Sequence, residues 1–278
     1  MSLHWNEMMS VGVPSLDADH RFLITLINHL NRAIGDVEEY LAVASVLRGV
    51  EDYAAVHFAR EERLMLACGF PQFARHRQTH QGFITSLAAL RHRYDQDRAG
   101  ARDSLGFLNR WLIDHICSSD MGYRSWLVLQ DAALAAVGPE PLFAPPGPEA
   151  DWRQLTLLLA EDNLTLREIL LTFLQGAGVR GDRVMMVAHA DAARRALASG
   201  RVDLMLCDDD FEGGGLALIE HSRRAGLALP MVLLTTGGPD RRTAARAVGA
   251  DATLDKPVSA AALVATLAAL TAGLSLRG

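Results

Sequence analysis

The stretch from His57 to His80 places four potential metal ligands on two consecutive predicted helices. His57 and Glu61 are four residues apart, so their side chains would lie on one face of a helix. His76 and His80 repeat this spacing on the next helix. Two such pairs on neighbouring antiparallel helices would face one bundle interior, where helical proteins build metal sites. The plainer alternative is two polar helix faces that carry histidines by chance, and the further ligands described next argue against it.

A fourth predicted helix adds His115 and Asp120 within the segment WLIDHICSSD. On an ideal α-helix a spacing of five residues turns two side chains roughly 140° apart, so these two would not reach one site. Ser118 and Ser119 lie between them and could accompany a local widening of the helix, a feature often found at functional sites. His20, on the first predicted helix, supplies a further imidazole.

Apolar periodicity predicts the helices that must position these residues, at about 17–34, 38–66, 71–98 and from about 102 onward. Four long helices with short joints indicate an all-α, up-down-up-down bundle, which we assign to residues 1–137. The next segment, 138–151, contains GPEPLFAPPGPEA, with five prolines in thirteen residues. Because proline is excluded from helix interiors and central strands, this segment is predicted to be a linker.

Beyond the linker the pattern changes to short apolar runs that alternate with helical segments. The runs at 155–160, 184–188, 204–207 and 231–235, followed by a short fifth strand, are typical of parallel strands buried on both faces. Alternating strands and helices imply right-handed crossovers. We therefore predict an α/β, doubly wound, five-stranded parallel sheet over residues 152–278.

Residues that can do chemistry follow these strands at their carboxyl ends, where open parallel sheets bind ligands. Glu161 and Asp162 follow the first strand and Asp208 ends the third, a carboxylate cluster that we expect to hold Mg²⁺. Asp208 could then be a nucleophile toward phosphoryl groups, with Lys256 pairing the charge and Thr235 bonding a phosphate oxygen. An ordinary acidic sheet edge is the alternative. Of the 27 basic residues only Lys256 is a lysine, and its position here argues for the site.

Charge and cysteine content narrow the classes of partner and compartment. The formal net charge is −6 and neither half has a basic patch, so we expect no nucleic-acid partner. Three cysteines, far apart in the chain, fit a reducing cytoplasm without disulfides. We see no basic-then-apolar leader, and the uncharged run at 258–276 is a weak membrane candidate, so we expect a cytoplasmic protein without a membrane anchor.

The motifs WNEMMSVGVPSLDADH, HFAREE, HRQTH and WLIDHICSSD resemble those of the bacterial hemerythrins over about residues 3–130. Matched residue by residue, the resemblance implies seven metal ligands, namely His20, His57, Glu61, His76, His80, His115 and Asp120. It also implies two non-haem irons bridged by Glu61, Asp120 and an oxo or hydroxo group. Five histidines shared unevenly between two irons would leave one iron a position open to dioxygen, and imidazole suits iron.

The motifs LLLAEDN, DLMLCDDD, MVLLTTGG and GADATLDKP resemble receiver domains of bacterial two-component response regulators, from about residue 153 to 273. The resemblance implies a flavodoxin-like fold, Asp208 as the phosphoacceptor, and a sensor histidine kinase or phosphotransfer protein as partner. Two places depart from the family pattern. After Asp208 the chain reads DDFEGGG instead of a Met-Pro turn and a slightly longer loop, and Thr253 stands where an aromatic switch residue is usual. We expect the phosphorylation chemistry to survive, whereas the usual threonine–aromatic signalling route lacks its aromatic.

Together these features predict a cytoplasmic two-component signalling protein that couples a dioxygen-binding, redox-sensing diiron domain to an Asp-phosphorylated receiver. Such a chain would not be an enzyme toward an outside substrate, although its receiver would catalyse phosphoryl transfer to Asp208, and it would act through a downstream partner protein. One alternative is a diiron peroxidase or nitric oxide scavenger controlled by the receiver, and another is dioxygen or iron storage. A saturated set of seven ligands, with no extra acid or base, argues for reversible binding.

Overall fold

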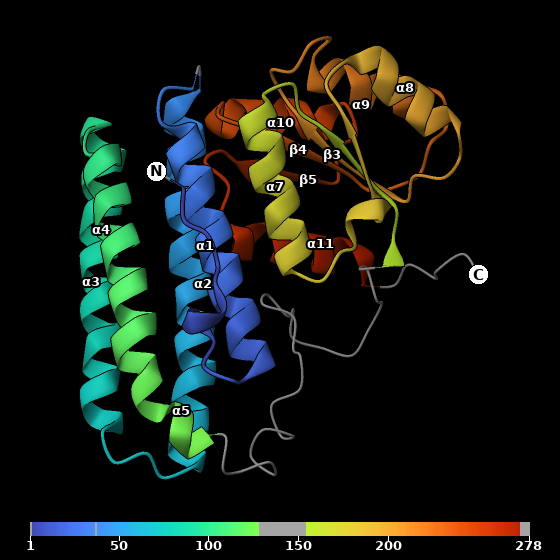
Figure 1. The fold of residues 1–278 in the computed structure, drawn as a ribbon. Helices are drawn as coiled ribbons and strands as arrows, with labels where there is room; N and C mark the ends of the chain where they lie inside the picture. Colours follow the sequence, from blue (N-terminus) through green and yellow to red (C-terminus); the bar gives the residue numbers. More distant parts are fainter. Residues whose placement is uncertain (1, 37, 128–153, 273–278) are drawn as a thin grey trace. The chain divides into compact units, whose positions relative to one another are not determined.

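The structure is a computed structural model that describes residues 2–36, 38–127 and 154–272. The chain divides into two compact units between residues 142 and 143, and Figure 1 shows the first unit in blue to green and the second in yellow to red. The predicted linker, 138–151, lies outside the described residues. Within the described ranges, no helix combines the length and the apolar character that crossing a bilayer requires.

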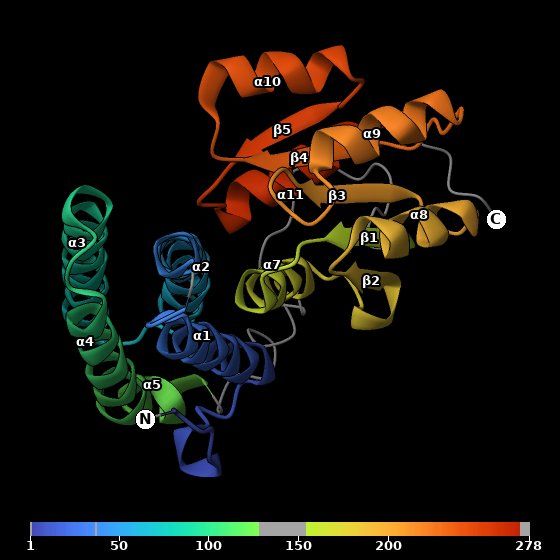
Figure 2. The same cartoon turned by 90° about the horizontal axis from the view of Figure 1, so that it is seen from above.

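The first unit is a bundle of antiparallel helices. After a short 3-10 turn, η1 (Glu7–Met9), come α1 (Pro14–Ala33), α2 (Glu39–Ala67), α3 (Phe73–Asp97), α4 (Ala101–Asp114), the turn η2 (His115–Asp120) and α5 (Met121–Leu127). Successive helices are neighbours, and α4 closes the ring against α1, as the view along the helices shows (Figure 2). The predicted bundle is confirmed. The first helix begins three residues earlier than expected, because proline is tolerated in the first turn.

The turn η2 is π-helical and joins α4 to α5 without a break in the helix. A π-helix closes hydrogen bonds from residue i to i+5 and therefore holds one more residue in its turn than an α-helix. The hydroxyl of Ser118 donates to the carbonyl oxygen of Asp114 at this point, which is the kind of side-chain bond that accompanies bending and widening. The predicted local widening between His115 and Asp120 is confirmed.

The second unit is a three-layer α/β fold. In its described part five parallel strands lie in the order β2-β1-β3-β4-β5, with bounds β1 (Leu157–Ala160), β2 (Val184–Val187), β3 (Leu204–Asp208), β4 (Met231–Thr235) and β5 (Ala252–Asp255). The helices between and after them are α7 (Leu164–Gly176), α8 (Ala190–Ala198), α9 (Gly215–Arg224), α10 (Gly238–Ala247) and α11 (Ala260–Thr271). The predicted doubly wound sheet is confirmed.

The sheet has a packed core on each face. Side chains of α8, α9 and α10 pack with alternate residues of β1, β3 and β4 in one buried cluster, and α7 contacts α11. The register places Ala160 at the end of β1 beside Cys207, and Asp208 beside Leu234. Since all strands run the same way, the residues that follow β1, β3, β4 and β5 meet at one edge, where an open sheet binds ligands.

Candidate metal centre and candidate phosphoacceptor site

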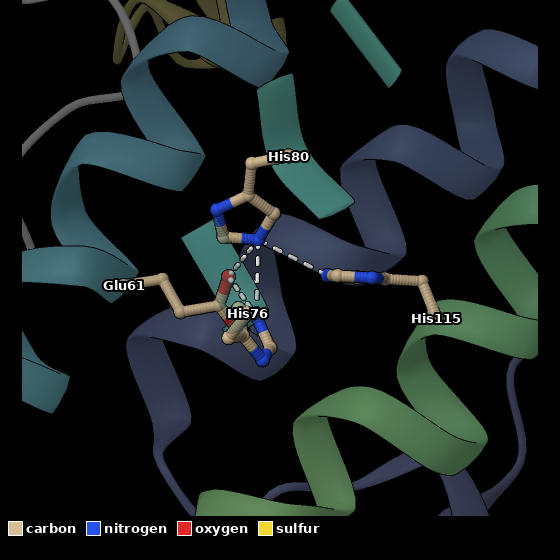
Figure 3. A group of neighbouring side chains, drawn as sticks. All are labelled: Glu61, His76, His80 and His115. Carbon is tan, nitrogen blue, oxygen red and sulfur yellow. Dashed lines mark hydrogen bonds and ion pairs between the residues drawn. The ribbon is translucent and has the colours of Figure 1, made fainter. Parts of the chain in front are cut away.

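The structure brings all seven predicted metal ligands together inside the helical bundle, and all seven are buried. Side-chain atoms of Glu61, His76, His80 and His115 lie within 4.8 Å of one another, and a second group with the same spread holds His20, His57 and Glu61. Figure 3 shows one ring nitrogen of His80 facing the other members of the first group. Glu61 belongs to both groups.

Asp120 also contacts both groups, through different oxygens. Its Oδ1 lies 3.0 Å from Nε2 of His115 and 3.5 Å from Nε2 of His76. Its Oδ2 lies 3.3 Å from Nε2 of His20. Two carboxylates that each reach both groups of imidazoles are arranged as they would be if they spanned two cations.

Four elements supply these side chains, and helix spacing explains how they converge. α1 carries His20, whereas α2 and α3 each carry a pair four residues apart, which one helix face presents together. The π-helical turn carries His115 and Asp120. Its i to i+5 hydrogen bonding stacks residues five apart, so both side chains face inward despite a spacing that an ideal α-helix would spread apart.

The donor set fits metal cations. Nε2 of His80 lies 3.1 Å from Nε2 of His76 and 3.1 Å from Nε2 of His115, so three ring nitrogens converge. Among the described residues, both carboxylate oxygens of Glu61 and of Asp120 are buried without a hydrogen bond of good geometry. Buried anionic oxygens are costly unless they are paired or coordinate a cation, so the cluster suits bound metal better than a closed polar core.

The pKa shifts of the two carboxylates and of His115 favour ligation, whereas the carboxylates near His20 and His80 outweigh burial and raise the pKa of those two imidazoles. Burial opposes the charge of Glu61, but the neighbouring His76 and His80 hold its pKa well below the ordinary value. Burial and the nearby Glu61 likewise oppose the charge of Asp120, whereas His115 and His20 lower its pKa overall. Burial lowers the pKa of His115. Ionised carboxylates and a neutral imidazole are the forms that bind metal.

Charged residues outside the predicted set hold two of the imidazoles in place. Nδ1 of His57 lies 3.1 Å from Oδ2 of Asp19, and Nδ1 of His80 lies 2.9 Å from Oε1 of Glu62. A carboxylate at Nδ1 directs Nε2 toward the metal position. Arg60 Nη1 lies 2.7 Å from both oxygens of Asp19. Sequence reasoning missed these residues, although Asp19 and Arg60 directly precede predicted ligands.

Aromatic rings cover the imidazoles of one group. The ring of Phe58 stacks on His80 with centroids 3.9 Å apart, and Trp111 stacks on His115 at 4.2 Å. A surface hollow of about 400 Å³ is lined by Phe58, His80 and Glu62, among others. A second hollow of about 260 Å³ reaches His76 beside the π-helical turn. Both hollows therefore adjoin the group that holds His76, His80 and His115.

In the second unit, Lys256 lies between two buried carboxylates. Its Nζ is 2.8 Å from Oε2 of Glu161 and 2.7 Å from Oδ1 of Asp208. Glu161, Asp162 and Asp208 form a group that could hold a cation, with Asp162 exposed. Burial raises the pKa of Glu161 to about 7 and also raises the pKa of Asp208. Burial opposes the charge of Lys256, but the two carboxylates raise its pKa overall, so it stays cationic.

Thr235 reaches the same edge but bonds another residue. Its Oγ1 donates to Oδ2 of Asp209 at 2.8 Å and accepts from the backbone N–H of Gly237 at 3.0 Å. Asp209 is 4 % exposed, and Nε and Nη2 of Arg241 donate to its two oxygens at 2.6 Å each. Sequence reasoning treated Asp209 only as an acidic neighbour of Asp208. Its burial carries no sequence signal, because a run of three aspartates resembles a solvated loop.

Comparisons with known proteins match a different family to each half of the chain. The family model described as "Hemerythrin HHE cation binding domain" matches residues 11–127, and that described as "Response regulator receiver domain" matches residues 157–268. A bacteriohemerythrin of Stenotrophomonas maltophilia (strain R551-3) is 35 % identical over 121 residues, which cover 44 % of this chain and 78 % of that protein. One of Pseudomonas aeruginosa (strain LESB58) is 35 % identical over 122 residues, with the same shares covered.

A solved structure is similar to part of this chain. It is the crystal structure of a putative response regulator from Chloroflexus aurantiacus J-10-fl, which is 29 % identical and covers 42 % of this chain and 96 % of its own, with a TM-score of 0.39. The two family matches lie one after the other along the chain, with the hemerythrin match first. The chain therefore belongs to the hemerythrin family and joins an N-terminal hemerythrin domain to a C-terminal response regulator receiver domain.

Proposed function

We propose that this protein is a two-component signalling protein in which a non-haem diiron centre that binds dioxygen is coupled to a phosphoacceptor at Asp208. One observation carries the proposal for the first half: Glu61 and Asp120 each contact two groups of buried histidines. We assign residues 1–137 to the hemerythrin domain, 138–151 to a linker and 152–278 to the receiver. The three cysteines lie within the described ranges and form no disulfide there, and the location that we propose is the cytoplasm, where thiols stay reduced.

The bundle would hold two irons with its own side chains. His76, His80 and His115 would bind one ion and His20 and His57 the other, with Glu61 and Asp120 between them. Three imidazoles on one ion and two on the other leave the second with room for a small ligand. Bound iron would supply reversible binding of dioxygen, and the protein's residues orient the imidazoles and exclude bulk water.

The receiver edge suits phosphoryl transfer to Asp208. A carboxylate oxygen of Asp208 attacks the phosphorus of the donor, a phosphohistidine or acetyl phosphate, and forms a P–O bond. The bond from phosphorus to the donor's nitrogen or oxygen breaks, and its electron pair leaves with the donor. Lys256, 2.7 Å from Asp208, pairs the negative charge, and Mg²⁺ held by Glu161, Asp162 and Asp208 would offset the charge of the phosphoryl oxygens. A sensor histidine kinase or phosphotransfer protein is the partner that this chemistry requires.

Iron content and absorption spectra test the first site. The purified protein should contain two irons per chain and show a charge-transfer band that changes with dithionite and returns with air. A His76→Ala, His80→Ala double variant should lose iron, because two of the seven ligands are removed. His92→Ala is the matched control, since His92 is exposed on the same helix. Full iron content in the double variant would contradict the assignment.

Labelling with acetyl phosphate and Mg²⁺ tests the second site. Intact-mass measurement should show one phosphoryl group on the wild type and none on Asp208→Asn. Single alanine variants of Asp209 and Asp210, the acidic neighbours, should still be labelled. Labelling of Asp208→Asn at the wild-type level would refute Asp208 as the acceptor.

Coupling between the two sites is the remaining part of the proposal, and its motive is that two sites share one chain. Dioxygen affinity should change when a beryllofluoride mimic occupies Asp208. Phosphoryl lifetime should also differ among apo, reduced and oxidised protein. Typical coupling is about 5- to 150-fold, and reciprocity requires the same factor on both equilibrium affinities. Equal values in all states would mean that the fusion only keeps two independent domains together.

A further inference from the structure

We infer that Asp209, held by Arg241, is a positioning residue that keeps the hydroxyl of Thr235 away from Asp208 until Asp208 is phosphorylated, an inference that rests on the proposed phosphorylation. We call these three residues, Asp209, Thr235 and Arg241, the latch. Neither the family resemblance nor the sequence pattern assigns a role to Asp209 or Arg241. The latch offers a signalling route in a chain that has Thr253 where receivers usually have an aromatic residue.

The contacts of Asp209 show a carboxylate whose place is strongly determined. It is 4 % exposed, and both of its oxygens accept from Arg241 at 2.6 Å. Such a two-point guanidinium–carboxylate pair has a defined geometry as well as charge. The backbone N–H of Asp209 also donates to the carbonyl oxygen of Leu234, and the carbonyl oxygen of Asp209 accepts from the N–H of Gly215, each at 2.9 Å. The acceptor that Thr235 uses is therefore fixed from both its side chain and its backbone.

The hydroxyl of Thr235 has one proton to donate, and here the proton goes to Asp209. Thr235 is buried, and its oxygen also accepts from the N–H of Gly237. A phosphoryl oxygen on Asp208 would compete with Asp209 for this proton, since one hydroxyl cannot serve both. Phosphorylation that recruits Thr235 must therefore break its hydrogen bond to Asp209.

Loss of the hydrogen bond between Thr235 and Asp209 changes the surroundings of the Arg241 side chain. Arg241 lies in α10, and its side chain is 41 % exposed. Its stem lies directly over Gly237, where an added Cβ would be 2.5 Å from Cβ of Arg241. Arg241 thus connects the turn that follows β4 to the end of β3. When Thr235 leaves, the side chain of Asp209 keeps its two bonds to Arg241, and the guanidinium can adjust together with the first turns of α10 while the backbone of Asp209 stays in place. The exposed face of α10 would report the phosphorylation state.

Beryllofluoride binding to the full-length protein in Mg²⁺ tests the latch without a covalent step. Asp209→Ala should tighten beryllofluoride binding about tenfold, because Thr235 no longer gives up a hydrogen bond to a charged acceptor. In a Thr235→Ala background, Asp209→Ala should change the affinity less than about twofold, since no latch remains to be broken. Asp210→Ala removes the same charge from an exposed neighbour and controls for simple electrostatics.

Each measurement has one outcome that supports the latch and one that contradicts it. An equal effect of Asp209→Ala with and without Thr235 would show a charge effect and overturn the latch, as would no effect at all. Asp209→Asn keeps an acceptor oxygen and should give an intermediate affinity, which covers the case that the alanine variant fails to fold. Hydrogen exchange at α10 should change on beryllofluoride binding in the wild type and not in Arg241→Met. If wild-type Asp208 takes no phosphoryl label from acetyl phosphate, the proposed receiver function itself fails, and the latch with it.

Discussion

Replacing Arg60 by methionine should leave a buried carboxylate without its guanidinium beside the candidate metal centre. Arg60 is 2 % exposed and Asp19 is fully buried, and Nη1 of Arg60 lies 2.7 Å from both carboxylate oxygens. Burial tends to raise the pKa of Asp19, whereas His57 and Arg60 lower it overall. Removing one partner of a buried ion pair typically costs about 3–5 kcal/mol, and full burial means that solvent cannot screen the change.

A second substitution should recover most of this loss. In an Arg60→Met, Asp19→Asn double variant the charge is gone, and the asparagine oxygen can still accept from Nδ1–H of His57. Replacing a buried pair by uncharged groups is often neutral or stabilising, so we expect a coupling energy of at least about 2 kcal/mol between the two positions. Asp19→Asn alone should weaken iron retention about 10- to 100-fold in chelator competition, because a carboxylate partner at a ligating histidine contributes that much.

Hydrogen exchange at the amides of α2, measured in the full-length protein, is the suitable assay for stability. Two compact units need not unfold together, so a single global transition is not assured, and exchange reports the helical unit separately. The reasoning is wrong if Arg60→Met costs less than about 1 kcal/mol, the size of an exposed ion pair. It is also wrong if the double variant costs the sum of the two single variants.

Four further outcomes are expected from the surroundings of Glu161, His29, Gly215 and Gly82. Burial raises the pKa of Glu161 to about 7, so protons compete with Mg²⁺ for this carboxylate below that pH. Calorimetry should show the Mg²⁺ affinity rising about tenfold between about pH 6 and pH 8. The Glu161→Gln variant should lose this pH dependence. Burial lowers the pKa of His29 to about 4, whereas an unfolded histidine titrates near about 6.5. The unfolded state then binds more protons between these values, so the helical unit should lose up to about 3 kcal/mol as pH falls through this window, and His29→Gln should reduce the slope measured by hydrogen exchange. In Gly215→Ala the added Cβ would clash with the carbonyl oxygen of Asp208 and lie 2.7 Å from Leu233, so this variant should lower the receiver's melting temperature and slow labelling of Asp208. In Gly82→Ala the added Cβ would meet open space, so this variant should stabilise α3 by about 0.5–1 kcal/mol.

Spacing along the chain was sufficient for much of the architecture. Pairs of ligands four residues apart lie on one helix face whatever surrounds the helix, so the convergence of His57 with Glu61 and of His76 with His80 could be predicted. The residues after parallel strands meet at one edge for a similar reason, and Lys256 indeed lies within 2.8 Å of Glu161. His115 and Asp120 show where the rule needs correction, since only the backbone hydrogen bonds of the π-helical turn bring them together.

The sequence by itself determined the two fold classes and the candidate ligands, because helical and strand periodicities convert local spacing into faces and edges. Only the tertiary structure decided which charged side chains are buried and which residues they contact. Arg60 pairs with Asp19 across 41 residues, and Arg241 pairs with Asp209 across 32. Local patterns assign such residues to the surface, since an isolated charge is costly to bury. The cost is offset only when a partner from a distant segment arrives with the right geometry, and no local pattern contains that information.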